Sequence, residues 1–239
     1  MLDTPNPDGK YGRQTRRGFL FAGMMLLIGC GTKRATSTLP SPIWTGTGTL
    51  TTRPIKEEEK QKSTVSISAI SRKTWAKGPP VPKRMKSMKP PKYITIHHDG
   101  MAAAFTDTSQ SSAAARLETI RIAHLTRRDG GKWGDIGYHF AIDPAGRLWE
   151  GRSLRWQGAH VKAKNEGNIG VVVLGNYELQ TMNRAQSAAV ESTLRQLMKK
   201  YNVPVSRVRT HREWADTLCP GKDLQRLMGI LRRSSLKKV

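Results

Sequence analysis

Apolar residues recur in short blocks over the C-terminal two-thirds of the chain. The run from Tyr93 to His98 is β-branched and alternating, which predicts a strand that ends in two histidines. Residues 169–174 are nearly all apolar, as expected for a strand buried on both faces. Shorter runs predict three further strands. These runs are Tyr138 to Ile142, Arg147 to Glu150 and Arg207 to Thr210, and a turn at Asp143 to Gly146 joins the first two.

Three other segments place apolar residues at helical spacing. The segment from Ser111 to Arg128 gathers Leu117, Ile120 and Ala123 on one face. The other two helices are predicted over Met182 to Tyr201 and Asp223 to Leu231. Because strands and helices alternate, the pattern predicts the α/β class, with a central mixed β-sheet flanked by α-helices in a single domain.

The N-terminal segment does not follow this pattern. Residues 16–20 read Arg-Arg-Gly-Phe-Leu, a twin-arginine export pattern. The apolar run from Gly18 to Gly29 is shorter than the roughly 20 residues that span a bilayer, so it suits a signal peptide. Cys30 follows directly, which resembles a bacterial lipoprotein processing site. We therefore predict a lipoprotein signal peptide over residues 1–30, lipidated at Cys30. An uncleaved anchor, or an ordinary signal with an incidental cysteine, is the alternative.

Residues 31–70 separate this segment from the predicted domain. They are rich in Thr, Ser, Pro and Lys and show no lasting apolar periodicity, which is typical of a flexible tether. The folded domain is predicted over residues 71–239. A lipid at Cys30 would place this domain outside the cytoplasm, in the periplasm or cell envelope, anchored to a membrane.

The chain is strongly basic. It has 41 Lys and Arg against 18 Asp and Glu, a formal net charge of +23. The positive electrostatic field of such a chain attracts polyanions. The aromatic residues are not interleaved with the basic runs and no nucleic-acid motif is present, so we predict no nucleic-acid partner. For an exported chain, the candidate polyanions are cell-wall polymers and anionic membrane surfaces. A solvated basic surface without a specific partner is the alternative.

Residues with candidate chemistry gather at the predicted strand ends. His97 and His98 end the first strand, Tyr138 begins the second, His211 follows the last, and Cys219 lies on the loop after it. The only other cysteine is in the export segment, so Cys219 has no evident disulfide partner. Thiolate and imidazole together suit zinc, and three protein ligands would leave one position open. Periodicity does not choose between His97 and His98, which face opposite sides of the strand.

Four strings in a fixed order resemble the zinc-dependent N-acetylmuramoyl-L-alanine amidases, a family that includes the peptidoglycan recognition proteins. The strings are Ile96-His97-His98, Asp135-Ile136-Gly137-Tyr138-His139-Phe140, Gly158-Ala159-His160 with Asn165 and Ile169-Gly170, and His211 through Cys219-Pro220. Their order and spacing fit from about Ser71 to Leu231. The resemblance implies a Zn²⁺ ion held by two histidines and a cysteine, which here are His97, His211 and Cys219.

The resemblance also implies roles for other residues. Tyr138 matches the family's active-site tyrosine, and Thr217 stands where relatives carry lysine or threonine, so both are expected to be catalytic. His160 and Asn165 match positions that line the substrate groove and are expected to bind substrate. Asp99 departs from the Ser or Thr of many relatives. Its carboxylate is expected either to change the electrostatics of the groove or to support the metal ligands from behind.

The function implied is zinc-dependent hydrolysis of the amide bond between N-acetylmuramic acid and the L-alanine of the stem peptide, for cell-wall remodelling or recycling. The expected partners are peptidoglycan or muropeptides, and the chain is expected to act as a monomer. The alternative is a peptidoglycan-binding module without catalysis. Binding-only relatives typically lose a ligand, often the cysteine, whereas this chain keeps all three and Tyr138. The export signals disfavour a phage-type lytic enzyme.

Overall fold

The computed structural model of the protein describes residues 66–128 and 131–238. The predicted signal peptide, the lipidation site Cys30 and the predicted tether up to residue 65 lie outside the described residues. None of the helices in these described ranges has the length and apolar character of a membrane span.

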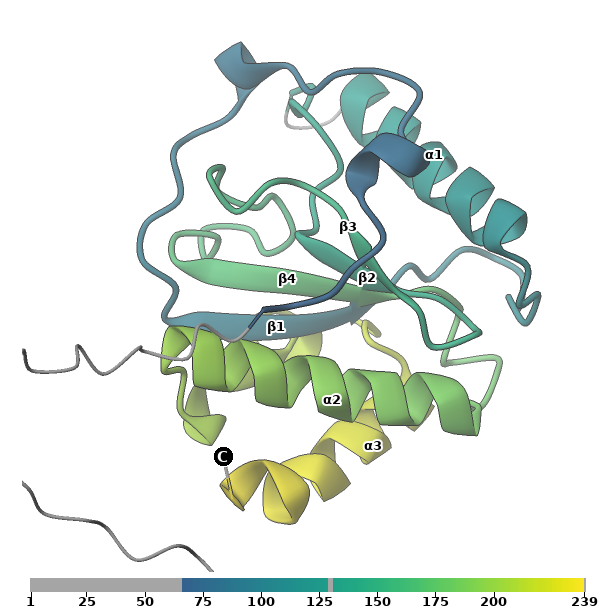
Figure 1. The fold of residues 1–239 in the computed structure, drawn as a ribbon, viewed down its shortest axis with the longest axis vertical. Helices are drawn as coiled ribbons and strands as arrows, with labels where there is room; N and C mark the ends of the chain where they lie inside the picture. The colour runs from purple at the N-terminus through teal and green to yellow at the C-terminus, as the bar shows by residue number, and fades with distance from the viewer. Residues whose placement is uncertain (1–65, 129–130, 239) are drawn as a thin grey trace, which may run out of the picture. The chain divides into compact units, whose positions relative to one another are not determined.

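Within the described residues, five strands form one mixed sheet in the order β3-β2-β4-β1-β5 (Figure 1). The strands are β1 (Tyr93–His98), β2 (Phe140–Ile142), β3 (Leu148–Glu150), β4 (Asn168–Val173) and β5 (Val208–Thr210). Strand β1 is parallel to both β4 and β5, and β2 is parallel to β4. Strand β3 pairs with β2 as an antiparallel hairpin. The predicted central mixed sheet is therefore confirmed.

The helices cover the two faces of this sheet. They are α1 (Gln110–Thr126), α2 (Arg184–Tyr201) and α3 (Lys222–Arg233). Figure 1 shows α2 and α3 together on one side of the sheet and α1 on the other. Ile94 and Ile96 of β1 belong to the larger apolar core, with residues of α2 and α3. Leu117 of α1 packs with Val172 and Trp149 in a smaller second core.

Polar caps explain why two helices begin one or two residues away from their predicted starts. The Ser109 hydroxyl accepts a hydrogen bond from the Ser112 N–H (3.2 Å), which starts α1. The Asn183 side chain accepts one from the Gln186 N–H (2.8 Å), which starts α2. Such caps are worth about 1 kcal/mol and satisfy N–H groups that the helix itself cannot. Apolar periodicity locates a helix, and the capping residue sets its first turn.

The two faces of β1 have different neighbours. Ile94 and Ile96 enter the core, so alternation places Thr95 and His97 on the opposite face. There, Thr95 receives a hydrogen bond from the indole of Trp214 (3.0 Å), and His97 contacts His160. Both partners lie outside the α-helices. Polar side chains of β1 thus meet loops that come from distant parts of the chain.

Candidate metal centre

One nitrogen each of His97 and His211 and the sulfur of Cys219 lie within 4.8 Å of one another. Among the described residues this is the one such group of three or more His, Cys, Asp or Glu side chains. His97 lies near the end of β1, and His211 directly follows β5. Because β1 and β5 are parallel neighbours, their carboxyl ends meet at one edge of the sheet. The structure therefore brings together the three side chains that the resemblance singled out.

The neighbouring histidine faces the other way. His98 accepts a hydrogen bond at Nδ1 from the backbone N–H of Tyr177 (3.2 Å), and the two rings stack 6.4 Å apart. His97 is fully buried on the opposite face, beside His211. Of the two histidines between which periodicity could not choose, His97 is the one in the cluster.

Burial sets the protonation of the three side chains. It lowers the pKa of His97 well below its usual value, with His160 and His211 adding to the effect, and it lowers the pKa of His211 as well. Burial also raises the pKa of the Cys219 thiol to about 12. Without a metal, the cluster therefore holds two neutral imidazoles and a protonated thiol at neutral pH.

This donor set fits zinc. Zinc–nitrogen bonds of about 2.0 Å and zinc–sulfur bonds of about 2.3 Å put the ligand atoms of a tetrahedral site roughly 3.5 Å apart. The distance from Cys219 Sγ to His97 Nδ1 is 3.6 Å. Two imidazoles and a thiolate can hold the ion with little movement, and the three-ligand set leaves a position for water or substrate.

Tyr138 lies beside the cluster, two residues before β2. Its ring centroid is 5.1 Å from that of His97, and the side chain is half-buried. Desolvation raises the pKa of the phenol, with Cys219 adding to the effect, so the hydroxyl keeps its proton. Over residues 66–128 and 131–238, no hydrogen bond engages this hydroxyl. It is a donor free to bind a ligand.

Residues 87–222, more than half of the chain, match the N-acetylmuramoyl-L-alanine amidase family. The chain belongs to this family. The N-acetylmuramoyl-L-alanine amidase of Mus musculus is 32% identical over 154 residues, which cover 64% of this chain and 28% of the mouse protein. The peptidoglycan-recognition protein SC2 of Drosophila melanogaster is 27% identical over 164 residues, which cover 68% of this chain and 85% of that protein.

Solved structures of related proteins share the fold. Wild-type Drosophila PGRP-LB superposes with a TM-score of 0.58 and 26% identity, covering 69% of this chain and 92% of that chain. A PGRP-LB mutant in complex with tracheal cytotoxin superposes with a TM-score of 0.59 and 25% identity, covering 70% and 95%. The sheet and helices of the amidase family are therefore present in this chain.

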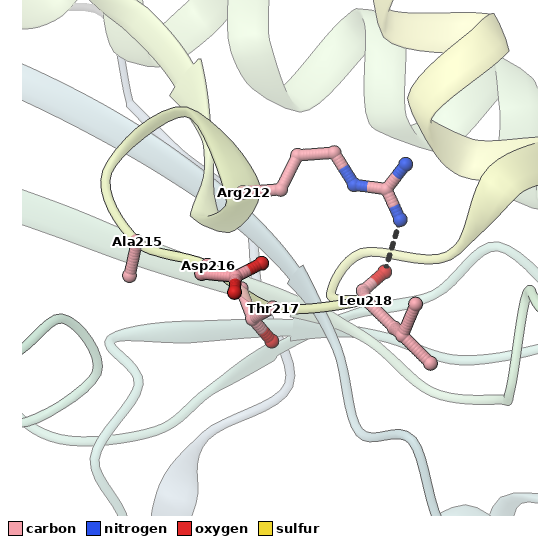
Figure 2. Close-up of a pocket in the computed structure, with 5 residues that line it drawn as sticks. All are labelled: Arg212, Ala215, Asp216, Thr217 and Leu218. Atoms are coloured by element: carbon pink, nitrogen blue, oxygen red, sulfur yellow. Dashed lines mark hydrogen bonds between the residues drawn. The ribbon is translucent and has the colours of Figure 1, made fainter.

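The loop that carries Cys219 in this amidase-family chain is fastened by Arg212. The Arg212 backbone N–H donates to the Cys219 carbonyl (2.9 Å), and its guanidinium donates to the Leu218 carbonyl (2.8 Å; Figure 2). The guanidinium also reaches the Glu178 carboxylate at 3.4 Å. These bonds tie the loop to its own start and to the segment after β4, which holds the sulfur near His97.

Thr217 lies on the same loop. It lines a hollow of about 540 Å³ together with Arg212, Asp216 and Leu218 (Figure 2). Its Oγ1 accepts a hydrogen bond from the Cys219 N–H (3.2 Å), which leaves the hydroxyl proton available to donate. A catalytic role for Thr217 stays a prediction.

A larger cavity of about 640 Å³ opens beside His211. Its lining includes His160 and Asn165, the two residues that the resemblance assigned to the substrate groove. The Asn165 side-chain oxygen accepts hydrogen bonds from the backbone N–H groups of His160 and Val161, both at 2.9 Å. Asn165 therefore shapes the loop that forms this wall of the cavity. Its binding of substrate stays a prediction.

Asp99 forms an internal ion pair with α1. Arg116 donates two hydrogen bonds to its carboxylate, at 2.8 and 2.7 Å, and the backbone N–H groups of Gly175 and Met101 donate two more. The Asp99 side chain is 1% exposed. With its charge compensated in this way, Asp99 fastens α1 to the end of β1, and its carboxylate does not add an unpaired charge to the groove.

We expect the Asp99→Asn variant to lose roughly 3 kcal/mol of unfolding free energy, because the Arg116 charge is left buried without its partner. The Arg116→Leu variant, which leaves the carboxylate unpaired, should lose a similar amount. Urea unfolding of the metal-free proteins measures both. The double variant should lose clearly less than the sum of the two single losses. Additive losses would show that the pair contributes no coupling energy.

The buried His139 and the half-buried His124, both outside the cluster, predict how stability depends on pH. His139 accepts a hydrogen bond from the Gly170 N–H at Nδ1 and donates one to the Trp156 carbonyl from Nε2. Burial lowers the pKa of His139 and of His124 to about 4. An unfolded histidine titrates near 6.5, so between pH 6.5 and 4 the unfolded chain binds protons that the folded chain does not.

The contribution of these histidines to stability is therefore complete above pH 6.5 and is lost as the pH falls towards 4. We expect a loss of about 1.4 kcal/mol per pH unit for each histidine in that window. Urea unfolding of the zinc-free protein at pH 7.5 and pH 5.0 measures the difference. Equal unfolding free energies at the two pH values would contradict the assignment of these two residues as neutral in the folded chain.

Proposed function

We propose that this chain is a zinc-dependent amidase that hydrolyses the amide bond between N-acetylmuramic acid and the L-alanine of the stem peptide in peptidoglycan. The observation that supports this best is the cluster of His97, His211 and Cys219 with the side chain of Tyr138 beside it. Two similarities support the substrate class. The mouse relative is named for this activity, and a PGRP-LB mutant has been solved with tracheal cytotoxin.

His97, His211 and Cys219 would hold the zinc. When bound, zinc supplies a Lewis acid that polarises an amide carbonyl and activates water near neutral pH. Cys219 must release its thiol proton for this, whereas both imidazoles are already neutral. Binding of the ion should therefore release one proton per chain near neutral pH.

The surrounding residues act on the substrate amide. Tyr138 donates a hydrogen bond to the amide oxygen as negative charge develops on it. Thr217, with its proton free, can donate a second bond or orient the substrate, although it cannot supply the positive charge of a lysine. The cavity beside His211, with His160 and Asn165 in its wall, receives the stem peptide. Water adds across the C–N bond, leaving a carboxylate on the lactyl group and an amine on L-alanine.

The test is digestion of purified peptidoglycan by the zinc-loaded full chain. We expect new L-alanine amino groups, detected by amine labelling and mass spectrometry, to appear with zinc and to be absent with chelator. Activity should return when zinc is added back. A protein with a full complement of zinc that releases no stem peptide would contradict the amidase function.

The second candidate is a peptidoglycan-binding module without hydrolysis. The similarity to peptidoglycan-recognition protein SC2, which covers 85% of that protein, favours it. Co-sedimentation with insoluble peptidoglycan, measured beside the digestion, separates the two functions. Sedimentation without release of amino groups would identify a binding module.

We also propose that the chain is exported and held at a membrane in the periplasm or cell envelope by a lipid at Cys30. The twin-arginine pattern and the cysteine after Gly29 support this. Labelled palmitate should enter the wild-type chain and not the Cys30→Ala variant in a bacterial host. Equal labelling of the two chains would refute lipidation at this cysteine.

A further inference from the structure

His160 uses both of its ring nitrogens inside the protein. Its Nδ1 lies 3.0 Å from Nε2 of His97, and its Nε2 lies 3.1 Å from the backbone carbonyl oxygen of Asn168. The residue is only 7% exposed, although it forms part of the cavity wall. Neither nitrogen is left to bind a substrate.

These two contacts determine which nitrogens carry protons. A carbonyl oxygen only accepts, so Nε2 of His160 carries the proton. A neutral imidazole has one N–H, so Nδ1 of His160 accepts, and Nε2 of His97 must donate to it. Both residues are buried, at 0% exposure for His97 and 7% for His160, and burial favours the neutral form of an imidazole. Nδ1 of His97 therefore carries a lone pair and no proton, and this nitrogen is the one that faces Cys219 Sγ.

Asn168, whose carbonyl accepts the hydrogen bond from His160, is itself held in place by hydrogen bonds. It is fully buried at the start of β4, and its side-chain oxygen accepts from the Thr95 hydroxyl (2.9 Å). Its amide nitrogen donates to the Lys164 carbonyl (2.8 Å). Thr95 and His97 lie on the same face of β1, so the carbonyl that orients His160 is tied to the strand that carries His97.

The ring of His160 also occupies a space that only glycine leaves open. A Cβ added at Gly158 or at Gly170 would lie 2.5 Å from Cδ2 of this ring. That distance is far below a van der Waals contact, so a side chain at either position would displace the imidazole. The backbone on two sides confines the ring to the position in which it meets His97.

We propose that His160 is a positioning residue, which fixes the tautomer and orientation of His97 so that Nδ1 of His97 is presented to the metal. This inference rests on the proposed zinc site but not on hydrolysis. It gives His160 a different function from the substrate contact that the resemblance implied. Partners that orient a metal-binding histidine typically change metal affinity 10- to 100-fold.

Two variants of His160 test the proposal through zinc affinity. His160→Leu removes the acceptor, and we expect the zinc dissociation constant, measured by competition with a chromogenic chelator, to rise about 10- to 100-fold. His160→Asn keeps an oxygen near the position of Nδ1 and should recover most of that affinity. Lys162→Ala is the matched control, because Lys162 lines the same cavity and should leave zinc affinity unchanged. Wild-type affinity in His160→Leu would overturn the proposal.

The metal-free wild-type protein provides an independent readout. Imidazole ¹⁵N chemical shifts should show the proton of His97 on Nε2 and none on Nδ1. A proton on Nδ1 of His97 would overturn the proposal, even if the His160 variants failed to fold. Neither measurement uses peptidoglycan. A chain that binds zinc as expected but releases no stem peptide would contradict the amidase function alone.

Discussion

Replacing Cys219 with alanine is expected to abolish zinc retention and amidase activity together. The sulfur is the one thiol in the cluster, and two histidines alone are a poor site for zinc, which uses three protein ligands even where its site is open to substrate. Loss of the ion removes several kcal/mol of transition-state stabilisation, so amide hydrolysis should fall by more than about a thousandfold. Elemental analysis and the release of L-alanine amino groups measure the two effects.

The matched control for this variant is the other cysteine of the chain. Cys30→Ala also removes one thiol but lies in the predicted export segment, so the purified protein should bind zinc with the wild-type stoichiometry. Circular dichroism should show that both variants keep the fold, because a thiol-to-methyl change at Cys219 removes little volume. Full zinc occupancy in Cys219→Ala would show that the ligand set is wrong.

Replacing Tyr138 with phenylalanine is expected to lower kcat about 100- to 1,000-fold, the usual effect of removing one hydrogen-bond donor to a developing oxyanion. Zinc content should not change, because phenylalanine keeps the ring contact with His97 and Tyr138 is not in the ligand cluster. KM should change little, since the bond strengthens only in the transition state. Steady-state hydrolysis of a muramyl peptide measures both constants.

Tyr177→Phe is the matched control for this effect. Its hydroxyl donates to the Leu174 carbonyl (3.0 Å) inside the core, and its ring, which phenylalanine keeps, stacks against His98. Loss of this hydroxyl should therefore affect stability and not kcat. If Tyr138→Phe hydrolyses the muramyl peptide as fast as the wild type, Tyr138 does not stabilise the transition state. Unchanged binding with lost hydrolysis would confirm a role in the chemical step.

Much of the fold follows from local pattern. The alternation from Tyr93 to His98 predicted β1 with its observed bounds, and the apolar run from 169 to 174 predicted β4 within one residue. The periodicity of residues 182–201 predicted α2 within two residues of its start. These predictions succeed because the periods of strand and helix, 2 and 3.6, are properties of the backbone that neighbouring residues reveal. Helix starts were less accurate, because caps and not periodicity set them.

The contacts of the candidate site could not be predicted from local sequence pattern. A strand places His97 and His98 on opposite faces, and only the packing of Ile94 and Ile96 against α2 and α3 decides which face is the core. His97 was preferred over His98 through family resemblance alone. The role of the Asp99 carboxylate was also ambiguous in the sequence, because its partner Arg116 lies 17 residues away on α1.

Two supporting residues were not anticipated at all. Arg212 donates hydrogen bonds to the backbone carbonyls of Leu218 and Cys219, and the backbone carbonyl of Asn168 orients His160. Every residue type has a backbone carbonyl, so the sequence does not reveal which carbonyls make such bonds. The helices, the strands and the residue types suited to zinc could be predicted from the sequence, since they depend on local spacing and side-chain chemistry. Tertiary structure alone decided which side chains meet and which nitrogen is presented, since those depend on parallel pairing between strands more than 70 residues apart.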